Sequence, residues 1–244
     1  MGFLVKLFNL TLYQPLFNIL IFLYQYLPGR DFGLAVITLT LIIKILLYPL
    51  GVRAIKIQKS LQVLQPKIKE IQTKYKENPK QQSLEMLALY KKEKINPFSG
   101  LAVSLVQIPI LIALWRVFWQ GFQPEKLAVL YSFVPRPTRI DPTFMGILNL
   151  STPSIFLAVL AGVTQFFQTK MISSLTSKSQ KKEKSQLPEI MEKQMLYFFP
   201  IFTFLILLKL PAALGLYWLV SSLFSIVQQY FILKKVPAPT KNYA

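Results

Sequence analysis

Residues 41–50, Leu-Ile-Ile-Lys-Ile-Leu-Leu-Tyr-Pro-Leu, place a single lysine inside a long apolar segment. The segment belongs to an apolar run from Gly33 to Gly51, which is long enough to cross a bilayer as a helix. A lysine at the centre of such a helix costs roughly 2.5–3.5 kcal/mol on the insertion scale. Lys44 lies about eight residues, or about 12 Å, before the charged end of the run at Arg53, farther than its side chain comfortably reaches. We therefore expect Lys44 to face a wet or protein-lined cavity rather than to snorkel to the interface.

Four further stretches of the chain are apolar and nearly free of charge. They cover 98–115, 140–167, 195–208 and 210–233, and 53% of the 244 residues are hydrophobic. A soluble nucleic-acid-binding protein could carry the net charge of +18, but it would not also carry runs of this length. The sequence therefore predicts an all-α polytopic membrane protein.

The composition also excludes several kinds of chemistry. The chain has no His and no Cys, so it has no thiolate nucleophile, no Ser-His dyad and no zinc site of the ordinary ligand type. None of its ten acidic residues lies in the middle of an apolar run, which argues against an ion-coupled transporter. We expect no catalytic residue, no metal and no cofactor, and hence no enzymatic activity.

Periodicity and helix breakers divide the chain into segments. Leu, Ile and Tyr recur every three or four residues from Leu61 to Tyr75, and Asn78-Pro79 then predicts a turn into a second helix, so that the two form a hairpin. The aromatic segment before Leu27 is interrupted by polar residues, which favours an interfacial amphipathic helix, with a sixth span as the alternative. The predicted order is an interfacial helix at 1–31; spans at 32–52, 97–120, 151–172, 194–209 and 212–233; a helical hairpin at 53–96; an extracytoplasmic loop at 121–150; a cytoplasmic loop at 173–193; and a basic tail at 234–244.

Charge predicts the orientation. Lys and Arg concentrate in the hairpin, in the loop at 173–193 and in the tail, and the positive-inside rule assigns such segments to the cytoplasm. With five spans, the N-terminus is then outside and the C-terminus is cytoplasmic. No cleavable signal peptide is expected before Leu10.

Polar residues recur at helical spacing within the predicted spans. Any one of them is typical of hydrogen bonding between membrane helices. Together with a cation that has no acidic partner inside the spans, they favour a shared hydrophilic groove. The candidate groove residues are Lys44, Thr40, Gln107, Gln165, Gln168, Trp218, Ser221 and Gln228.

Several short motifs occur in the order and spacing of one known family. Besides residues 41–50, they are Leu64-Gln65-Pro66, Asn96-Pro97, Gln107-Ile108-Pro109-Ile110, Phe199-Pro200 and the stretch Pro-Ala-Ala-Leu-Gly-Leu-Tyr-Trp at 211–218. Through these motifs the chain resembles the YidC/Oxa1/Alb3 membrane protein insertases, in the short bacterial form that lacks a large extracytoplasmic domain.

The resemblance implies a groove inside a bacterial cell membrane, open to the cytoplasm and to lipid and closed toward the outside. Lys44 would be its cation where most relatives carry Arg, so the charge is kept while the rigid fork of donors is lost. Residues 101–103 also depart from the family, whose members often have a Pro-containing turn there. The implied partners are nascent membrane proteins and membrane lipids, with the ribosome and the Sec translocon as further candidates and no small-molecule cofactor.

An insertase of this kind moves polar segments through a half-depth groove and releases apolar helices into lipid. One alternative is a small-solute channel or transporter in which Lys44 attracts anions. Another is a non-catalytic scaffold for membrane assembly. The hairpin favours the handling of polypeptide over that of small solutes.

Overall fold

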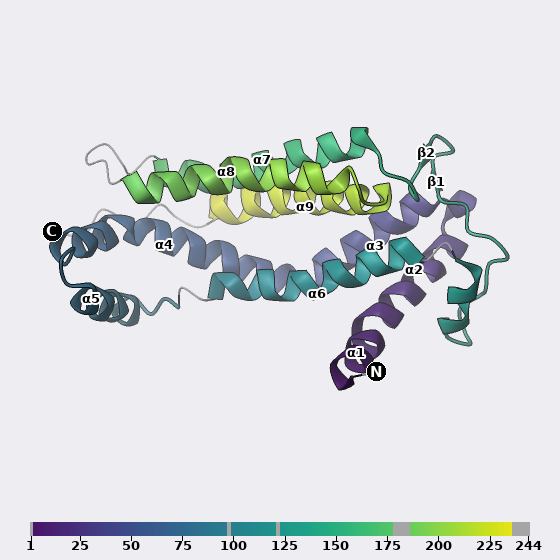
Figure 1. The fold of residues 1–244 in the computed structure, drawn as a ribbon, viewed down its shortest axis with the longest axis horizontal. Coiled ribbons are helices and arrows are strands. Elements are labelled where there is room, and N and C mark those ends of the chain that lie inside the picture. The colour runs from purple at the N-terminus through teal and green to yellow at the C-terminus, as the bar shows by residue number, and fades with distance from the viewer. Residues whose placement is uncertain (1, 97–98, 121–122, 178–185, 236–244) are drawn as a thin grey trace.

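A computed structural model of the chain (Figure 1) describes residues 2–96, 99–120, 123–177 and 186–235. The N-terminal helix combines α1 (Phe3–Phe8), a π-helical turn η1 (Asn9–Tyr13) and α2 (Gln14–Tyr26). Pro15 has no backbone N–H to bond the preceding turn, which accounts for the wider π-helical turn just before it. The helix Phe3–Tyr26 is long and apolar enough to cross a membrane. The interfacial helix and the sixth span therefore both stay predictions.

The predicted span at 32–52 is interrupted by a bend. Helix α3 (Phe32–Leu46), whose N-terminus is capped by the Asp31 carboxylate on the Leu34 N–H at 2.9 Å, ends before the predicted boundary. Helix α4 (Tyr48–Lys74) then starts at an angle of 61° to it. Pro49 lies in the first turn of α4, where no N–H is needed, so it begins a new helix rather than closing the old one.

The two helices of the predicted hairpin are α4 and α5 (Pro79–Lys92), with Asn78 capping the N-terminus of α5. The side chain of Gln82 donates to the Gln72 carbonyl at 3.1 Å, and Lys67 Nζ lies 2.9 Å from Glu93 Oε1. Leu64 and Ile68 are buried along the apolar face that the periodicity predicted.

The remaining long helices are α6 (Ser99–Gln120), α7 (Ile155–Ser177), α8 (Gln186–Leu207) and α9 (Ala212–Lys235). Helix α8 begins inside the predicted loop at 173–193. Helices α7, α8 and α9 lie together (Figure 1). Two glycines permit this close packing, because a Cβ on Gly162 would lie 3.3 Å from the Pro200 carbonyl and a Cβ on Gly215 would lie 3.1 Å from Leu157 Cβ.

The number of membrane spans is only partly settled by the helices. Among the described residues, two helices, Phe3–Tyr26 and Ala212–Lys234, are long and apolar enough to span alone, and the bent pair α3–α4 is a third candidate. The apolar parts of α6, α7 and α8 are shorter, at Leu105–Gln120, Ile155–Met171 and Leu196–Leu207. The fold is thus mostly helical with membrane-length elements, and the count of five spans stays a prediction.

The loop at 121–150 contains structure that the sequence did not predict. A 3-10 helix η3 (Pro124–Val129) precedes two short antiparallel strands, β1 (Thr143–Phe144) and β2 (Leu148–Asn149), with Thr143 opposite Asn149. The Phe144 ring packs so closely on Gly33 that a Cβ there would collide with it. The loop is therefore held against the start of α3.

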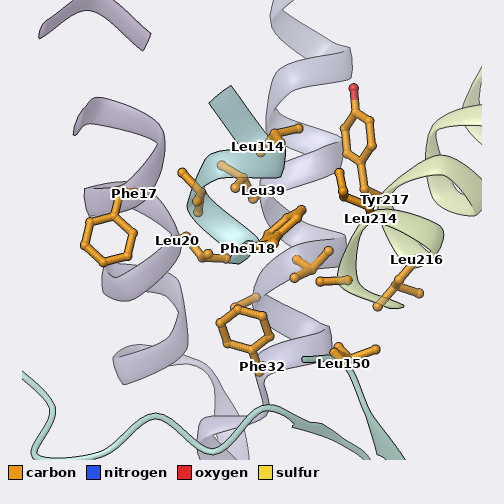
Figure 2. Close-up of a cluster of buried hydrophobic side chains, with 14 of the residues drawn as sticks. Phe17, Leu20, Phe32, Leu39, Leu114, Phe118, Leu150, Leu214, Leu216 and Tyr217 are labelled. Atoms are coloured by element: carbon orange, nitrogen blue, oxygen red, sulfur yellow. The ribbon is translucent and has the colours of Figure 1, made fainter. Parts of the chain in front are cut away.

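The apolar core lies where α2, α3, α6 and the start of α9 meet (Figure 2). Phe17, Leu20, Leu114 and Leu150 are fully buried, and Phe32 and Phe118 meet edge to face. The ring of Tyr217 borders this cluster, and its hydroxyl points away from Phe32 and Leu150 (Figure 2).

Candidate functional site

The helix bundle has two different ends. We call the end at residues 121–150 the loop end and the end at α4 and α5 the hairpin end (Figure 1). Side chains of the N-terminal helix tie the loop down: Gln14 Nε2 donates to the Val129 carbonyl at 3.1 Å and Asn18 Oδ1 accepts from the Tyr131 N–H at 2.7 Å. The Tyr24 hydroxyl oxygen accepts from a further loop N–H, that of Asp141, at 2.9 Å. The loop is therefore held against the N-terminal helix by both apolar packing and hydrogen bonds.

Lys44 lies on the last turn of α3, toward the hairpin end. Its side chain is half-buried, and Nζ donates to Ser225 Oγ on α9 at 3.2 Å. Ser225 Oγ in turn donates to the Ser221 carbonyl at 2.9 Å. Ser225 lies about 20 Å along α9 from its first residue, Ala212, so Lys44 meets the interior of that helix rather than its end.

The charge of Lys44 has no carboxylate beside it. Among the side chains that the structure describes, no carboxylate forms an ion pair with Lys44, whereas Lys67 pairs with Glu93 in the hairpin. The same part of the chain holds no group of three acidic side chains that could bind a metal ion. Among the described side chains, Lys44 is therefore a cation that donates to the hydroxyl of Ser225 rather than to a carboxylate, which suits a site that attracts anionic groups transiently.

Helix α9 carries polar contacts to several other elements. The Gln107 side-chain amide on α6 donates to the Tyr217 hydroxyl, and Trp218 Nε1 donates to Gln165 Oε1 on α7 at 3.0 Å. One face of α9 thus brings together polar groups of α3, α6 and α7. We call this set the polar row: Lys44, Gln107, Gln165, Tyr217, Trp218, Ser221, Ser225 and Gln228.

The polar row ends at the bend between α3 and α4. Gln228 Nε2 donates to the backbone carbonyl of Tyr48 at 3.1 Å. Gly51 faces the same amide, and a Cβ at that position would lie 2.9 Å from its Nε2 and Oε1 atoms. The absence of a side chain at Gly51 therefore allows α9 to hold the bend in place.

Six of the eight predicted groove residues belong to this row, and two do not. Thr40 is buried, and its hydroxyl donates to the Val36 carbonyl of its own helix at 2.7 Å. Gln168 is half-buried on α7, one turn beyond Gln165. The candidate groove residues did not include Ser225, the hydrogen-bond partner of Lys44, although it lies four residues after Ser221 and eight after Tyr217 on the same helical face.

An apolar recess lies beside the polar row, between α6 and α8. Its volume is about 300 Å³, and α6 contributes Leu111, Ile112 and Trp115 to its wall. Several of the side chains around it are exposed, so the recess is open to the surroundings of the helices. The other lining residues are Phe202, Ile206, Leu207, Leu210, Leu214 and Trp218. Trp218 contributes to both the recess and the polar row, so the two meet at its indole ring.

Comparison with known proteins gives one consistent result. The family model described as 60Kd inner membrane protein matches residues 22–239. A membrane protein insertase YidC of Fusobacterium nucleatum is 34% identical over 205 residues, which are 84% of this chain and 87% of that protein. A protein of the same name from Syntrophus aciditrophicus is 36% identical over 224 residues, but these cover 91% of this chain and only 36% of the relative.

A solved structure is also similar. It is described as an active YidC insertase crystal structure with the first transmembrane domain resolved, and it matches with a TM-score of 0.57 and 25% identity. The match covers 90% of this chain and 46% of the other. The chain thus spans less than half of several proteins that it resembles, and nearly all of one.

Proposed function

Because this chain belongs to the 60Kd inner membrane protein family, whose similar members are named membrane protein insertases, we propose that it inserts nascent membrane proteins into a bacterial membrane. The observation that carries this proposal is Lys44, a half-buried cation on the hairpin side of the packed loop end, with the Ser225 hydroxyl rather than a carboxylate as its described partner. Such a cation stabilises anionic or polar groups that would otherwise enter hydrocarbon without a partner.

The polar segment of a substrate must cross a hydrocarbon layer of about 30 Å. In the proposed mechanism it enters from the hairpin end and exchanges water for the amide, hydroxyl and ammonium groups of the polar row. Since the row extends over only part of α9, the segment crosses a thinner barrier than the whole bilayer. No covalent bond is made or broken, so this activity is not enzymatic.

The apolar segments of the substrate leave through a different surface. The recess between α6 and α8 is lined by apolar side chains and borders the polar row at Trp218. A substrate helix in the recess would exchange contacts with protein for contacts with lipid at little cost, because both are apolar. Because the recess is open to the surroundings of the helices, a substrate helix could leave it for the bilayer without any movement of the described helices.

The proposed topology follows from charge and from the family. The basic hairpin and the basic segments at 173–193 and 234–244 would be cytoplasmic, and the loop at 121–150 would face outside. With five spans, the N-terminus is outside and the C-terminus is in the cytoplasm. The basic hairpin also suits transient contact with the ribosome or the Sec translocon, since lysines bind RNA phosphates and acidic surfaces.

The test is insertion of a small one-span protein into proteoliposomes that contain this protein or its Lys44 variants. Lys44→Arg should retain most of the insertion, because it keeps the charge. Lys44→Ala should lower it about tenfold, the equivalent of about 1.4 kcal/mol, and Lys44→Glu should lower it further. Equal activity of all three variants would contradict the role of the cation and favour a scaffold.

Proteoliposomes also separate an insertase from a channel. Passage of small anions without insertion of the substrate protein would favour the channel or transporter. Insertion without anion passage would favour the proposed function.

A further inference from the structure

A second half-buried cation lies at the opposite end of the membrane helices. Arg116 is on the last turns of α6, at the loop end. Its Nη1 donates to Asn9 Oδ1 at 2.7 Å, and its guanidinium carbon lies 4.8 Å from the centre of the Tyr13 ring. Both partners belong to the π-helical turn η1, a type of turn that occurs often at functional sites.

The charge of Arg116 is held in place but is not neutralised. Its contacts are an amide oxygen and an aromatic face, together with a long bond of 3.4 Å from Nε to Gln120 Oε1. Among the side chains that the structure describes, no carboxylate forms an ion pair with it. A guanidinium has five N–H donors in a fork that matches phosphate oxygens, so donors remain for an anionic ligand.

The same face of α6 carries apolar groups on both sides of this charge. Trp115 and Trp119 are exposed and their rings lie 6.2 Å apart, as is typical of the level where a membrane meets water. Ile112 is one helical turn before Arg116 and lines the apolar recess between α6 and α8. A cation at headgroup level therefore lies about one turn, or about 5 Å, from a recess of apolar chemistry.

These two features fit the two parts of one kind of molecule. An apolar recess does not hold water favourably, whereas an acyl chain fills it without leaving a polar group unpaired. The guanidinium prefers a phosphate oxygen. A free phosphate would leave the recess empty, and an uncharged hydrocarbon would leave the guanidinium without an anion.

We infer that Arg116 and the α6–α8 recess together bind one phospholipid, with its phosphodiester on the guanidinium and an acyl chain in the recess. This inference rests on the proposed membrane function, because a substrate helix that leaves through the recess would displace the lipid. The lipid would keep the recess filled between rounds of insertion. Its site lies in the leaflet at the loop end.

Binding can be measured on the purified, delipidated protein by native mass spectrometry. The probes are phosphatidylglycerol, glycerol phosphate as the headgroup alone and dioleoylglycerol as the tails alone. Phosphatidylglycerol should bind at least about tenfold more tightly than either part, because it alone occupies the guanidinium and the recess at the same time. Equal binding of glycerol phosphate would overturn the inference in favour of a site for free phosphate.

Two variants remove the two halves of the site. Arg116→Gln, which can still donate to Asn9, should weaken phosphatidylglycerol binding about tenfold and leave dioleoylglycerol binding unchanged. Ile112→Trp should fill the recess and weaken both. The matched control is Arg136→Gln, which removes an exposed cation of the 121–150 loop and should change neither.

Unchanged phosphatidylglycerol binding by Arg116→Gln would overturn the inference. Circular dichroism of each variant shows whether its helices are intact, and Ile112→Trp keeps the test valid if Arg116→Gln fails to fold. No substrate protein is present in the assay. Loss of the lipid site is therefore distinguishable from failure of the proposed insertase activity, which the Lys44 variants test separately.

Discussion

The loop end and the hairpin end of this bundle contain different kinds of side chains. At the loop end, Phe17, Leu20, Phe118 and Leu150 are fully buried, and backbone groups of the loop are bonded to side chains of α2. Toward the hairpin end, α9 presents Ser and Gln to a half-buried lysine. The apolar packing at the loop end excludes water and stabilises one structure. The polar side chains toward the hairpin end offer hydrogen-bond partners to a polar segment of another molecule. The difference indicates that the apolar core lies at the loop end and that the polar row lies toward the hairpin end.

The largest expected effect is on stability at the loop end. Phe118→Ala removes a fully buried ring that meets Phe32 edge to face, so it should lower the free energy of unfolding by about 3–5 kcal/mol. Trp119→Ala is the matched control, because that ring is 54% exposed on the next residue. Denaturant titration in detergent measures both. Similar losses for the two variants would mean that the loop end is not a packed core.

The hairpin should be separable from the membrane core. Leu64→Gln and Ile68→Gln place an amide in a buried apolar face, and each should destabilise the hairpin by about 1–3 kcal/mol. Limited proteolysis should then cut α4 or α5 faster, while the membrane helices remain protected. If either variant instead prevents the protein from integrating into the membrane, the hairpin is not an independent unit.

A smaller effect is expected where the polar row meets the bend. Gly51→Ala places a Cβ 2.9 Å from the Gln228 amide, which must move away from the Tyr48 carbonyl. Loss of this hydrogen bond should cost about 1 kcal/mol and should lower insertion modestly. The double variant Gly51→Ala/Gln228→Ala should lose no more stability or insertion than Gln228→Ala alone, because without the Gln228 side chain the Cβ at residue 51 has nothing to clash with. Additive losses would show that Gly51 and Gln228 act independently.

Much of this fold was predictable because apolar length and periodicity identify membrane helices and amphipathic hairpins. The hairpin turn at Asn78-Pro79 and the helices at α6, α7 and α9 follow the predicted segments closely. The bend at Leu47 was not predicted, since Pro49 can either end a helix or begin one. The strands β1 and β2 were missed because two-residue strands leave no periodicity.

The site was predictable in type more than in detail. Lys44 is identifiable from its cost in an apolar helix, and polar residues four apart on α9 indicate one face. Which of them bond to one another depends on the packing of helices distant in sequence, so the pairs Lys44–Ser225 and Trp218–Gln165 could not be derived. Asn18 is one of the polar residues that interrupt the aromatic segment before Leu27, and its bond to the backbone of the 121–150 loop likewise could not be derived.

The central claim is that the polar row is reached by water from the hairpin end and not from the loop end. The native chain has no Cys, so single Cys variants can be labelled without background. Cys at Gln107 and Gln165, which are half-buried, should react with a membrane-impermeant maleimide added to the cytoplasmic side, because the reactive thiolate forms in contact with water. Cys at Ser221 and Gln228, each 9% exposed, should react more slowly.

The control positions are Leu160, which is half-buried, and Leu205, which is exposed on the apolar surface of α8. Cys should hardly react at either position, because both side chains are expected to be surrounded by apolar groups. The same reagent added only to the outside should leave all four polar positions unlabelled, because the loop end is sealed. Labelling from both sides would contradict the account and indicate a channel. Labelling from neither side would contradict it as well, and would show that the polar row serves only to hold the helices together.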